Sequence, residues 1–227
     1  MQRISRSNVL LAVLTILCVT TSFSAQAAKG QQNQKRGEPG VFDDYALSLS
    51  WAPSYCASHP TDPNECGPNK RFGFVLHGLW PQYEKSWPQF CSNATMTPKE
   101  EDQYAPLYPS KALMEHEWPK HGTCSGLGVD GYFTLSKTLK ESVRIPDAYQ
   151  QPATTFKTTS QELAKAFLTA NPDLKEGSVL AVCSGKFLSE IHVCFDKAGT
   201  QSRACSDSET KRANKSCHDA FLVQNVK

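Results

Sequence analysis

Long hydrophobic runs are scarce in the 227-residue sequence, and the one that stands out lies near the N-terminus. Residues 9–19 are apolar except for Thr15, whereas no later stretch approaches the roughly 18 apolar residues that a transmembrane helix needs. The sequence therefore predicts no membrane-spanning segment after this region.

The N-terminal run has the layout of a secretory signal peptide. Arg3 and Arg6 precede it, and Ala25-Gln26-Ala27 follows it as a cleavage signal of small residues. We therefore predict a signal peptide over residues 1–27 and a flexible leader over residues 28–40. Residues 41–227 are predicted to form a single domain of an exported protein, either periplasmic or extracellular.

An excess of charge of one sign is also absent. Loss of Arg3 and Arg6 with the signal peptide lowers the 24 Lys and Arg residues to 22, which equals the 22 Asp and Glu residues. A net charge near zero argues against a strongly basic protein that coats nucleic acid.

Cysteine, in contrast, is plentiful. Loss of Cys18 with the signal peptide lowers the nine cysteines to eight, an even number. In an oxidising compartment such a set predicts a disulfide framework, although the count alone allows about 105 pairings.

Apolar patterns predict several strands. Large apolar and small residues alternate over residues 45–51, which is typical of a half-buried strand that Pro53 would end. Further strands are predicted at residues 72–76, 179–183 and 188–195. Residues 56–70, rich in Pro, Asn, Asp and Gly, are predicted to form a loop.

Capping signals predict the helices. Helices are predicted to follow the capping boxes Thr97–Glu100 and Thr159–Glu162, and to follow Ser110 and Asp130. Strands and helices are mixed without regular alternation or internal repeats. The sequence therefore favours an α+β fold, with a central antiparallel sheet flanked by helices in one disulfide-stapled domain.

Histidine is scarce, and three of the six histidines lie in two short segments. Residues 74–82 read Phe-Val-Leu-His-Gly-Leu-Trp-Pro-Gln, and residues 116–124 read His-Glu-Trp-Pro-Lys-His-Gly-Thr-Cys. If the segments meet in space, they supply two imidazoles for proton transfer, further groups for an anion, and an aromatic surface. Such a set is suited to cleaving a phosphodiester without a metal.

Helical spacing is present within the second segment. Glu117 and His121 are four residues apart, as are His116 and Lys120, so a continuous helix would place each pair on one face. Pro119 removes one helical hydrogen bond, and a kink or a helix end at this point stays open.

The two segments resemble the catalytic segments of the ribonuclease T2 family, in matching order and separation. A looser likeness extends from about Tyr45 to Cys217. The resemblance implies an α+β endoribonuclease that cleaves single-stranded RNA through a 2′,3′-cyclic phosphate to 3′-phosphate ends, with low base specificity. We expect RNA and not DNA as the substrate, no metal or other cofactor, and a monomer.

The resemblance also implies a role for each catalytic residue. His121 resembles the general base that takes the proton of the ribose 2′-OH, and His77 resembles the general acid that protonates the leaving 5′-oxygen. Lys120 and Glu117 resemble residues that stabilise the pentavalent transition state. The ordinary imidazole pKa of about 6.5 allows one histidine to be neutral while another is charged.

Substrate binding is implied for three further residues. His116 resembles a phosphate-binding residue, and Trp80 belongs to a base-binding surface. Many family members have an acidic residue where this sequence has Gln82, which leaves the base preference open. His59, His192 and His218 lie outside both segments and are predicted to be exposed or structural.

A pairing of the cysteines follows from the same resemblance. The implied disulfides are Cys56–Cys66, Cys91–Cys124, Cys183–Cys217 and Cys194–Cys205.

Two other functions compete with this interpretation. A zinc hydrolase could use His77, His116 and His121, but His116 and His121 are five residues apart, whereas the zincin motif places its histidines at i and i+4. The protein could also be a catalytically idle RNA-binding or secreted interaction module, although both catalytic histidines are present.

Overall fold

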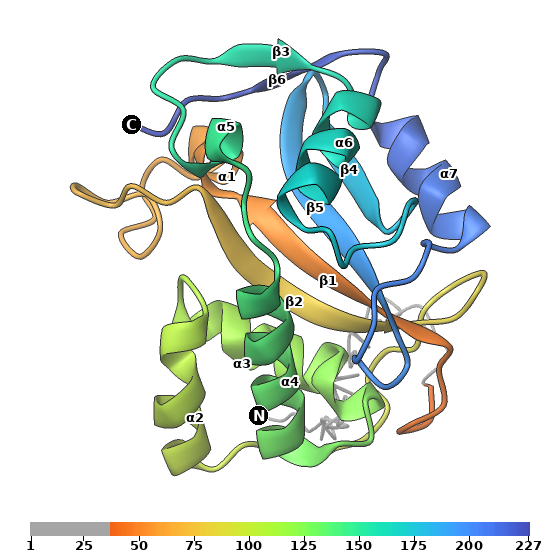
Figure 1. The fold of residues 1–227 in the computed structure, drawn as a ribbon. Helices are drawn as coiled ribbons and strands as arrows, with labels where there is room; N and C mark the ends of the chain where they lie inside the picture. The colour runs from red at the N-terminus through yellow and green to blue at the C-terminus, as the bar shows by residue number, and fades with distance from the viewer. Residues whose placement is uncertain (1–36) are drawn as a thin grey trace, which may run out of the picture. The chain divides into compact units, whose positions relative to one another are not determined.

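A six-stranded sheet organises residues 37–227, which are the residues that the computed structural model describes. The strand order is β2-β1-β5-β6-β3, and β4 also pairs with β5 (Figure 1). The strands are β1 (Asp44–Trp51), β2 (Phe74–Gln82), β3 (Phe156–Thr158), β4 (Val179–Ser184), β5 (Phe187–Asp196) and β6 (Phe221–Val223). All pairings are antiparallel except a single parallel pair between β5 and β6, which confirms the expected central antiparallel sheet.

Helices flank this sheet. Figure 1 shows α3 and α4 beside β1 and β2, with α2 packed against these two helices, and α6 and α7 beside β4. The helices are α1 (Ala52–Ser58), α2 (Pro98–Tyr104), α3 (Lys111–Lys120), α4 (Gly128–Ser142), α5 (Asp147–Gln150), α6 (Ser160–Ala170) and α7 (Asp207–Ser216). Two 3₁₀ turns, η1 (Ala105–Leu107) and η2 (Gly122–Cys124), follow α2 and α3. The α+β prediction is therefore confirmed.

Local sequence explains where several helices begin. Thr97 and Thr159 each accept a hydrogen bond from the backbone N–H of a glutamate three residues on, and complete the predicted capping boxes of α2 and α6. Ser110 caps α3 as expected. Asp130 does not begin α4: it lies in the first turn, two residues after the helix has started at Gly128.

The two faces of β1 differ in polarity, but both are buried except at Ser50, so the strand is not half-buried as predicted. Tyr45, Leu47, Leu49 and Trp51 are at most 2% exposed and belong to the hydrophobic core, as their alternation predicted. The opposite face, here called the polar face, is defined by β1, β2 and β5 through Asp44, Ser48, Ser50, Trp80, Glu190 and His192. Register aligns Ser48 with His192 and Ser50 with Glu190.

Three segments differ from the sequence-based expectation. The predicted loop over residues 56–70 begins inside α1, because Pro53 starts this helix in its first turn instead of merely ending the strand. β2 does not end at His77 but continues to Gln82. After Lys197 the chain forms α7 and β6, which the sequence patterns did not predict, because α7 is almost entirely polar and β6 has only three residues.

Disulfides join the eight cysteines of the described part. Cys56–Cys66, Cys91–Cys124, Cys183–Cys217 and Cys194–Cys205 are paired, which confirms the pairing that the resemblance implied.

The predicted signal peptide and most of the predicted leader lie outside the described residues. Of the leader, residues 37–40 are described, and Gly37 and Gly40 donate hydrogen bonds to the carbonyls of Gln89 and Cys124. Among residues 37–227, no helix is both long enough and apolar enough to cross a membrane.

Candidate active site

A bulge in β2 positions His77. Ser48 of β1 pairs with Gly78, but the next residue, Leu49, pairs with Leu76, so β2 carries one residue more than β1 at this point. Leu76 and Leu79 both face the core and are fully buried. The bulge therefore turns His77 towards the polar face, where its side chain is 33% exposed and accessible to a substrate.

Gly78 allows the second segment to approach this bulge. A Cβ atom at Gly78 would overlap the side chains of Glu117 and Trp80. Only glycine leaves this space free, so the His-Gly pair in the first segment has a steric reason.

The end of α3 carries the second segment. The helix runs through Pro119 to Lys120, and His121 is its C-cap residue, whose N–H donates to the carbonyl of Glu117 at 2.9 Å. Glu117 and His121 are thereby placed one turn apart. They are 1% and 4% exposed, respectively, so both are shielded from water.

Trp80 joins the two segments. Its Nε1–H donates to Oε2 of Glu117 at 2.6 Å. Its ring centroid lies 4.9 Å from that of His77 and 5.2 Å from that of His121, against which it is stacked. Both imidazoles therefore contact the same indole, and Nε2 of His77 lies 3.8 Å from Oε1 of Glu117.

His116 and Lys120 lie at the exposed side of α3. Nζ of Lys120 is 3.4 Å from Nε2 of His116, as expected for residues one helical turn apart. His116 is exposed and Lys120 is partly exposed. Their two donors therefore offer a place for an anionic group.

Hydrogen bonds hold the end of α3 against the segment that follows β2. The backbone N–H of Phe90 donates to the carbonyl of Lys120 at 3.0 Å, and that of Cys91 donates to Oγ1 of Thr123 at 3.2 Å. The Cys91–Cys124 disulfide closes the same junction. The position of His121 thus depends on contacts made after β2 as well as on α3.

The two imidazoles differ in their proton affinity. Burial lowers the pKa of His77, but the hydrogen bond and charge of Glu190 and the charge of Glu117 outweigh it, so that the pKa is raised. Burial lowers the pKa of His121 far below its ordinary value, and the positive charges of Lys120, His77 and His116 act in the same direction. His77 therefore favours the protonated form and His121 the neutral form.

Glu117 and His116 shift towards their neutral forms. Burial raises the pKa of Glu117, against the opposing effects of His77, Trp80 and Lys120. Burial, together with the charges of Lys120 and His77, lowers the pKa of His116. Burial therefore disfavours the charged form of both side chains.

Comparisons with known proteins identify the family. The model of the Ribonuclease T2 family matches residues 42–205. The chain belongs to the ribonuclease T2 family. A curated relative, a ribonuclease from Aeromonas hydrophila, is 38% identical over 203 residues, which cover 86% of this chain and 91% of that protein.

Solved structures share the fold. An RNase-related protein from Calystegia sepium has a TM-score of 0.66 at 22% identity and covers 85% of this chain and all of its own. RNase NT in complex with 5′-AMP has a TM-score of 0.55 at 28% identity, covering 73% of this chain and 91% of its own. Together with the family match, they make the chain an endoribonuclease with the ribonuclease T2 fold.

Six of the seven residues proposed for catalysis and binding in this ribonuclease lie around the junction of β2 and α3. They are His77, Trp80, His116, Glu117, Lys120 and His121. Gln82, the seventh, lies farther along β2 and is only 3% exposed, with its side-chain amide donating to the carbonyl of Trp80 at 3.5 Å. Contact between Gln82 and a base stays a prediction.

Sequence reasoning missed two residues beside His77. Nδ1 of His77 lies 3.0 Å from Oε2 of Glu190, and Oε1 of Glu190 lies 3.5 Å from Nε2 of His192. Both residues alternate with the apolar residues that identified β5, so the pattern placed them on its polar side. The contact depends on the registers in which β1 pairs with β2 and with β5, and no local pattern in the sequence encodes them.

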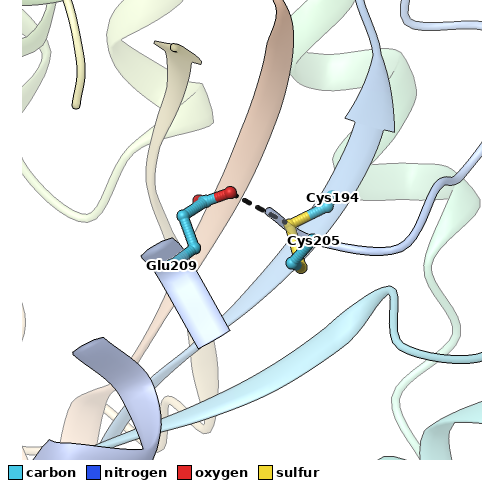
Figure 2. Close-up of side chains that lie close together, drawn as sticks. All are labelled: Cys194, Cys205 and Glu209. Atoms are coloured by element: carbon cyan, nitrogen blue, oxygen red, sulfur yellow. Dashed lines mark hydrogen bonds between the residues drawn. A yellow bond between two sulfur atoms is a disulfide. The ribbon is translucent and has the colours of Figure 1, made fainter. Parts of the chain in front are cut away.

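The geometry of the described residues does not favour a zinc site. Within residues 37–227, the histidines at 77, 116 and 121 do not form a group of ligand atoms close enough to hold one ion. The one group that meets this distance criterion is Cys194, Cys205 and Glu209 (Figure 2). Its two sulfurs form a disulfide, so neither is a thiolate that could bind a metal.

Proposed function

We propose that this ribonuclease cleaves single-stranded RNA by metal-independent transphosphorylation, with His121 as the general base and His77 as the general acid. The observation that carries this proposal is the placement of both imidazoles against the indole of Trp80, in surroundings that shift their pKa values in opposite directions. A general base must be neutral and a general acid must be protonated in the same enzyme molecule, and the two environments favour that combination.

The residues proposed for catalysis include no protein nucleophile, so the attacking group in this mechanism comes from the RNA itself. His121 takes the proton of the ribose 2′-OH, and the 2′-oxygen attacks the neighbouring phosphorus. The bond from phosphorus to the 5′-oxygen breaks as His77 gives that oxygen its proton. The product is a 2′,3′-cyclic phosphate, which water then opens to a 3′-phosphate. Because attack is intramolecular, it gains from proximity.

Lys120 and Glu117 are proposed to stabilise the pentavalent transition state. Lys120 is a cation within 3.4 Å of His116, so the two residues can share the non-bridging phosphate oxygens. Burial raises the pKa of Glu117, and the indole N–H of Trp80 fixes its Oε2 at the junction of β2 and α3. Fixed donors in a water-poor site stabilise growing charge strongly.

Trp80 is proposed to contact a base through its ring. Its only N–H is occupied by Glu117, so the indole has stacking surface and no free donor for reading base edges. Stacking tolerates every base, which supports low base specificity. Gln82 keeps its proposed contribution to base preference.

Relatives support a nucleotide substrate. RNase NT is described in complex with 5′-AMP, and the Aeromonas relative is named a ribonuclease. We extend this to an RNA substrate for the present chain.

Processing and assembly belong to the same proposal. Residues 1–27 act as a signal peptide, residues 28–40 as a leader and residues 41–227 as the catalytic domain of an exported monomer. Four disulfides suit an oxidising compartment, the periplasm or the medium.

A strand with one ribonucleotide among deoxynucleotides tests the chemistry. We expect cleavage only on the 3′ side of that ribose, with a cyclic phosphate detected first by mass spectrometry. A strand in which the single ribose carries a 2′-O-methyl group is the matched control and should stay intact. Cleavage at deoxy positions, or 5′-phosphate ends, would rule the mechanism out.

A further inference from the structure

Glu190 lies beneath His77 at the centre of the polar face. Its Oε2 is 3.0 Å from Nδ1 of His77 and accepts a hydrogen bond from Oγ of Ser48 at 2.7 Å. Its Oε1 is 3.5 Å from Nε2 of His192. One carboxylate is therefore held by groups from β1, β2 and β5.

These contacts determine which nitrogen of His77 faces the substrate. A carboxylate oxygen at 3.0 Å from Nδ1 requires a proton on that nitrogen. Nε2 is the other nitrogen, and it lies 3.8 Å from Oε1 of Glu117, on the side of α3. A carboxylate bonded to one imidazole nitrogen fixes the tautomer and the orientation of the ring.

Several charged groups act on His77 from the elements packed around it. Glu190 comes from β5, together with His192, which lies against Glu190. The second segment contributes Glu117, Lys120, His116 and His121 from α3 and its C-terminal end. Glu65 acts from the Cys56–Cys66 loop. Of these, Glu190 has the shortest distance to the ring and is the one with a hydrogen bond to it. Burial opposes ionisation of Glu190, but His192 and His77 outweigh burial and hold its pKa below the ordinary value.

We propose that Glu190 is a positioning residue of the catalytic site, which holds His77 through Nδ1–H so that Nε2 gives its proton to the leaving 5′-oxygen. This inference rests on the proposed role of His77 as the general acid. When Nε2 has lost its proton, His77 is left as the neutral Nδ1–H tautomer, still bonded to Glu190. Glu190 itself neither gains nor loses a proton in this step, and the proton taken from the 2′-OH stays on His121.

A purely structural role of Glu190 would give different results. In that case the carboxylate would serve only to bond Ser48 and to pair with His192 across the sheet. Its replacement would then change stability without changing the pH dependence of turnover.

The first test is the Glu190→Gln variant, compared with the wild type and with Glu176→Gln, which changes an exposed glutamate outside this cluster of contacts. We expect kcat on RNA to fall by about tenfold or more with little change in KM, which is less than full loss of a general acid.

The alkaline limb of the pH–kcat profile should move down by about one pH unit or more, because an adjacent negative charge is lost. Glu190→Asp should restore most of the limb. An unmoved limb in folded Glu190→Gln overturns the proposal.

A substrate with a p-nitrophenolate leaving group separates this inference from the proposed function. That group departs without a proton, so His77→Phe and Glu190→Gln should lose much less on it than on RNA. If His77→Phe loses equally on both substrates, the proposed general acid is wrong. If His77→Phe loses more activity on RNA than on this substrate while Glu190→Gln keeps its activity on RNA, only the inference about Glu190 fails.

A measurement on the unaltered protein keeps the proposal testable even if the glutamine variant does not fold. Nitrogen NMR of the neutral imidazole, above its pKa, should show His77 as the Nδ1–H tautomer. An Nε2–H tautomer would overturn the proposal without any substitution.

Discussion

Glu190 and Asp44 are two carboxylates on the same polar face of the sheet, yet their surroundings shift their pKa values in opposite directions. The Glu190 side chain is 17% exposed. The carboxylate of Glu190 accepts a hydrogen bond from Ser48 and lies beside ring nitrogens of His77 and His192. These two histidines lower its pKa, although burial opposes the shift. Asp44 is 0% exposed, and burial raises its pKa to about 7. The charge of Glu209 adds to this rise, and Arg203 at 2.8 Å only partly offsets it.

The difference lies in the balance between neighbours and burial: His192 and His77 outweigh burial at Glu190, whereas Arg203 does not outweigh it at Asp44. At the Glu190 end, the negative charge of the carboxylate raises the pKa of His77 and so favours its protonated form. At the Asp44 end the neighbouring Glu209 lies against the Cys194–Cys205 disulfide, with Oε2 3.8 Å from Sγ of Cys194 (Figure 2). We therefore assign catalysis to the first end and stability to the second.

The largest expected effect comes from the two histidines proposed as general base and general acid. Replacement of His77 or His121 by Phe should lower turnover of RNA by about 10²-fold or more, since a positioned acid or base contributes about 10²–10⁴-fold. Asp44→Asn, at the other end of the face, should keep nearly full activity. Initial rates and circular dichroism measure both. A folded His121→Phe enzyme with most of its activity would show that the base is misassigned.

The disulfide beside His121 and the disulfide of the Cys56–Cys66 loop should differ in their effects on stability and turnover. Cys91–Cys124 spans 33 residues and closes the junction beside His121, whereas Cys56–Cys66 spans 10 residues. The chain-entropy relation gives losses of about 4 and about 3 kcal/mol, respectively, when the cysteines are replaced by Ala. Urea unfolding should show this order, and only loss of Cys91–Cys124 should also lower kcat. Equal loss of kcat in both variants would contradict the anchoring role.

A smaller effect is expected for Asp44 on the pH dependence of stability. Its folded pKa of about 7 lies above the ordinary value of 3.8, so its contribution is present below pH about 4 and is lost as pH rises towards 7. Asp44→Asn stays neutral, and the decrease in unfolding free energy between pH 4.5 and 8 should shrink by on the order of 1 kcal/mol or more. Asp219→Asn, at an exposed site, is the control. An unchanged decrease would mean that Asp44 stays ionised with Arg203.

The smallest expected effect is that of a chelator. Turnover should be the same with and without EDTA, because Lys120 and the histidines supply the positive charge in the proposed mechanism. Loss of activity that zinc restores would support the competing zinc hydrolase.

Much of the fold was accessible from local sequence signals. The alternation over residues 45–51 predicted β1 correctly because its large apolar residues share one face, although the small residues between them are also buried except at Ser50. Thr97, Ser110 and Thr159 reported helix starts because capping is a contact within four residues. The pairing of the cysteines, in contrast, came from the family resemblance and not from their spacing.

The parts that local signals missed depend on long-range pairing. The bulge at His77 exists only because β1 pairs with β2 in a shifted register. Glu190 reaches His77 from 113 residues away, and no pattern within β5 encodes that distance. The helix α7 was missed because its sequence is almost entirely polar and buries few side chains.

The central claim is that His77 and His121 have opposite shifts of pKa in the free enzyme. Titration of the two imidazoles by NMR, assigned through the His77→Phe and His121→Phe variants, measures this directly. We predict that His77 titrates above about 6.5 and His121 well below it, so that turnover is lost on the acid side through His121 and on the alkaline side through His77. A His121 that titrates above His77 would contradict the assignment of base and acid.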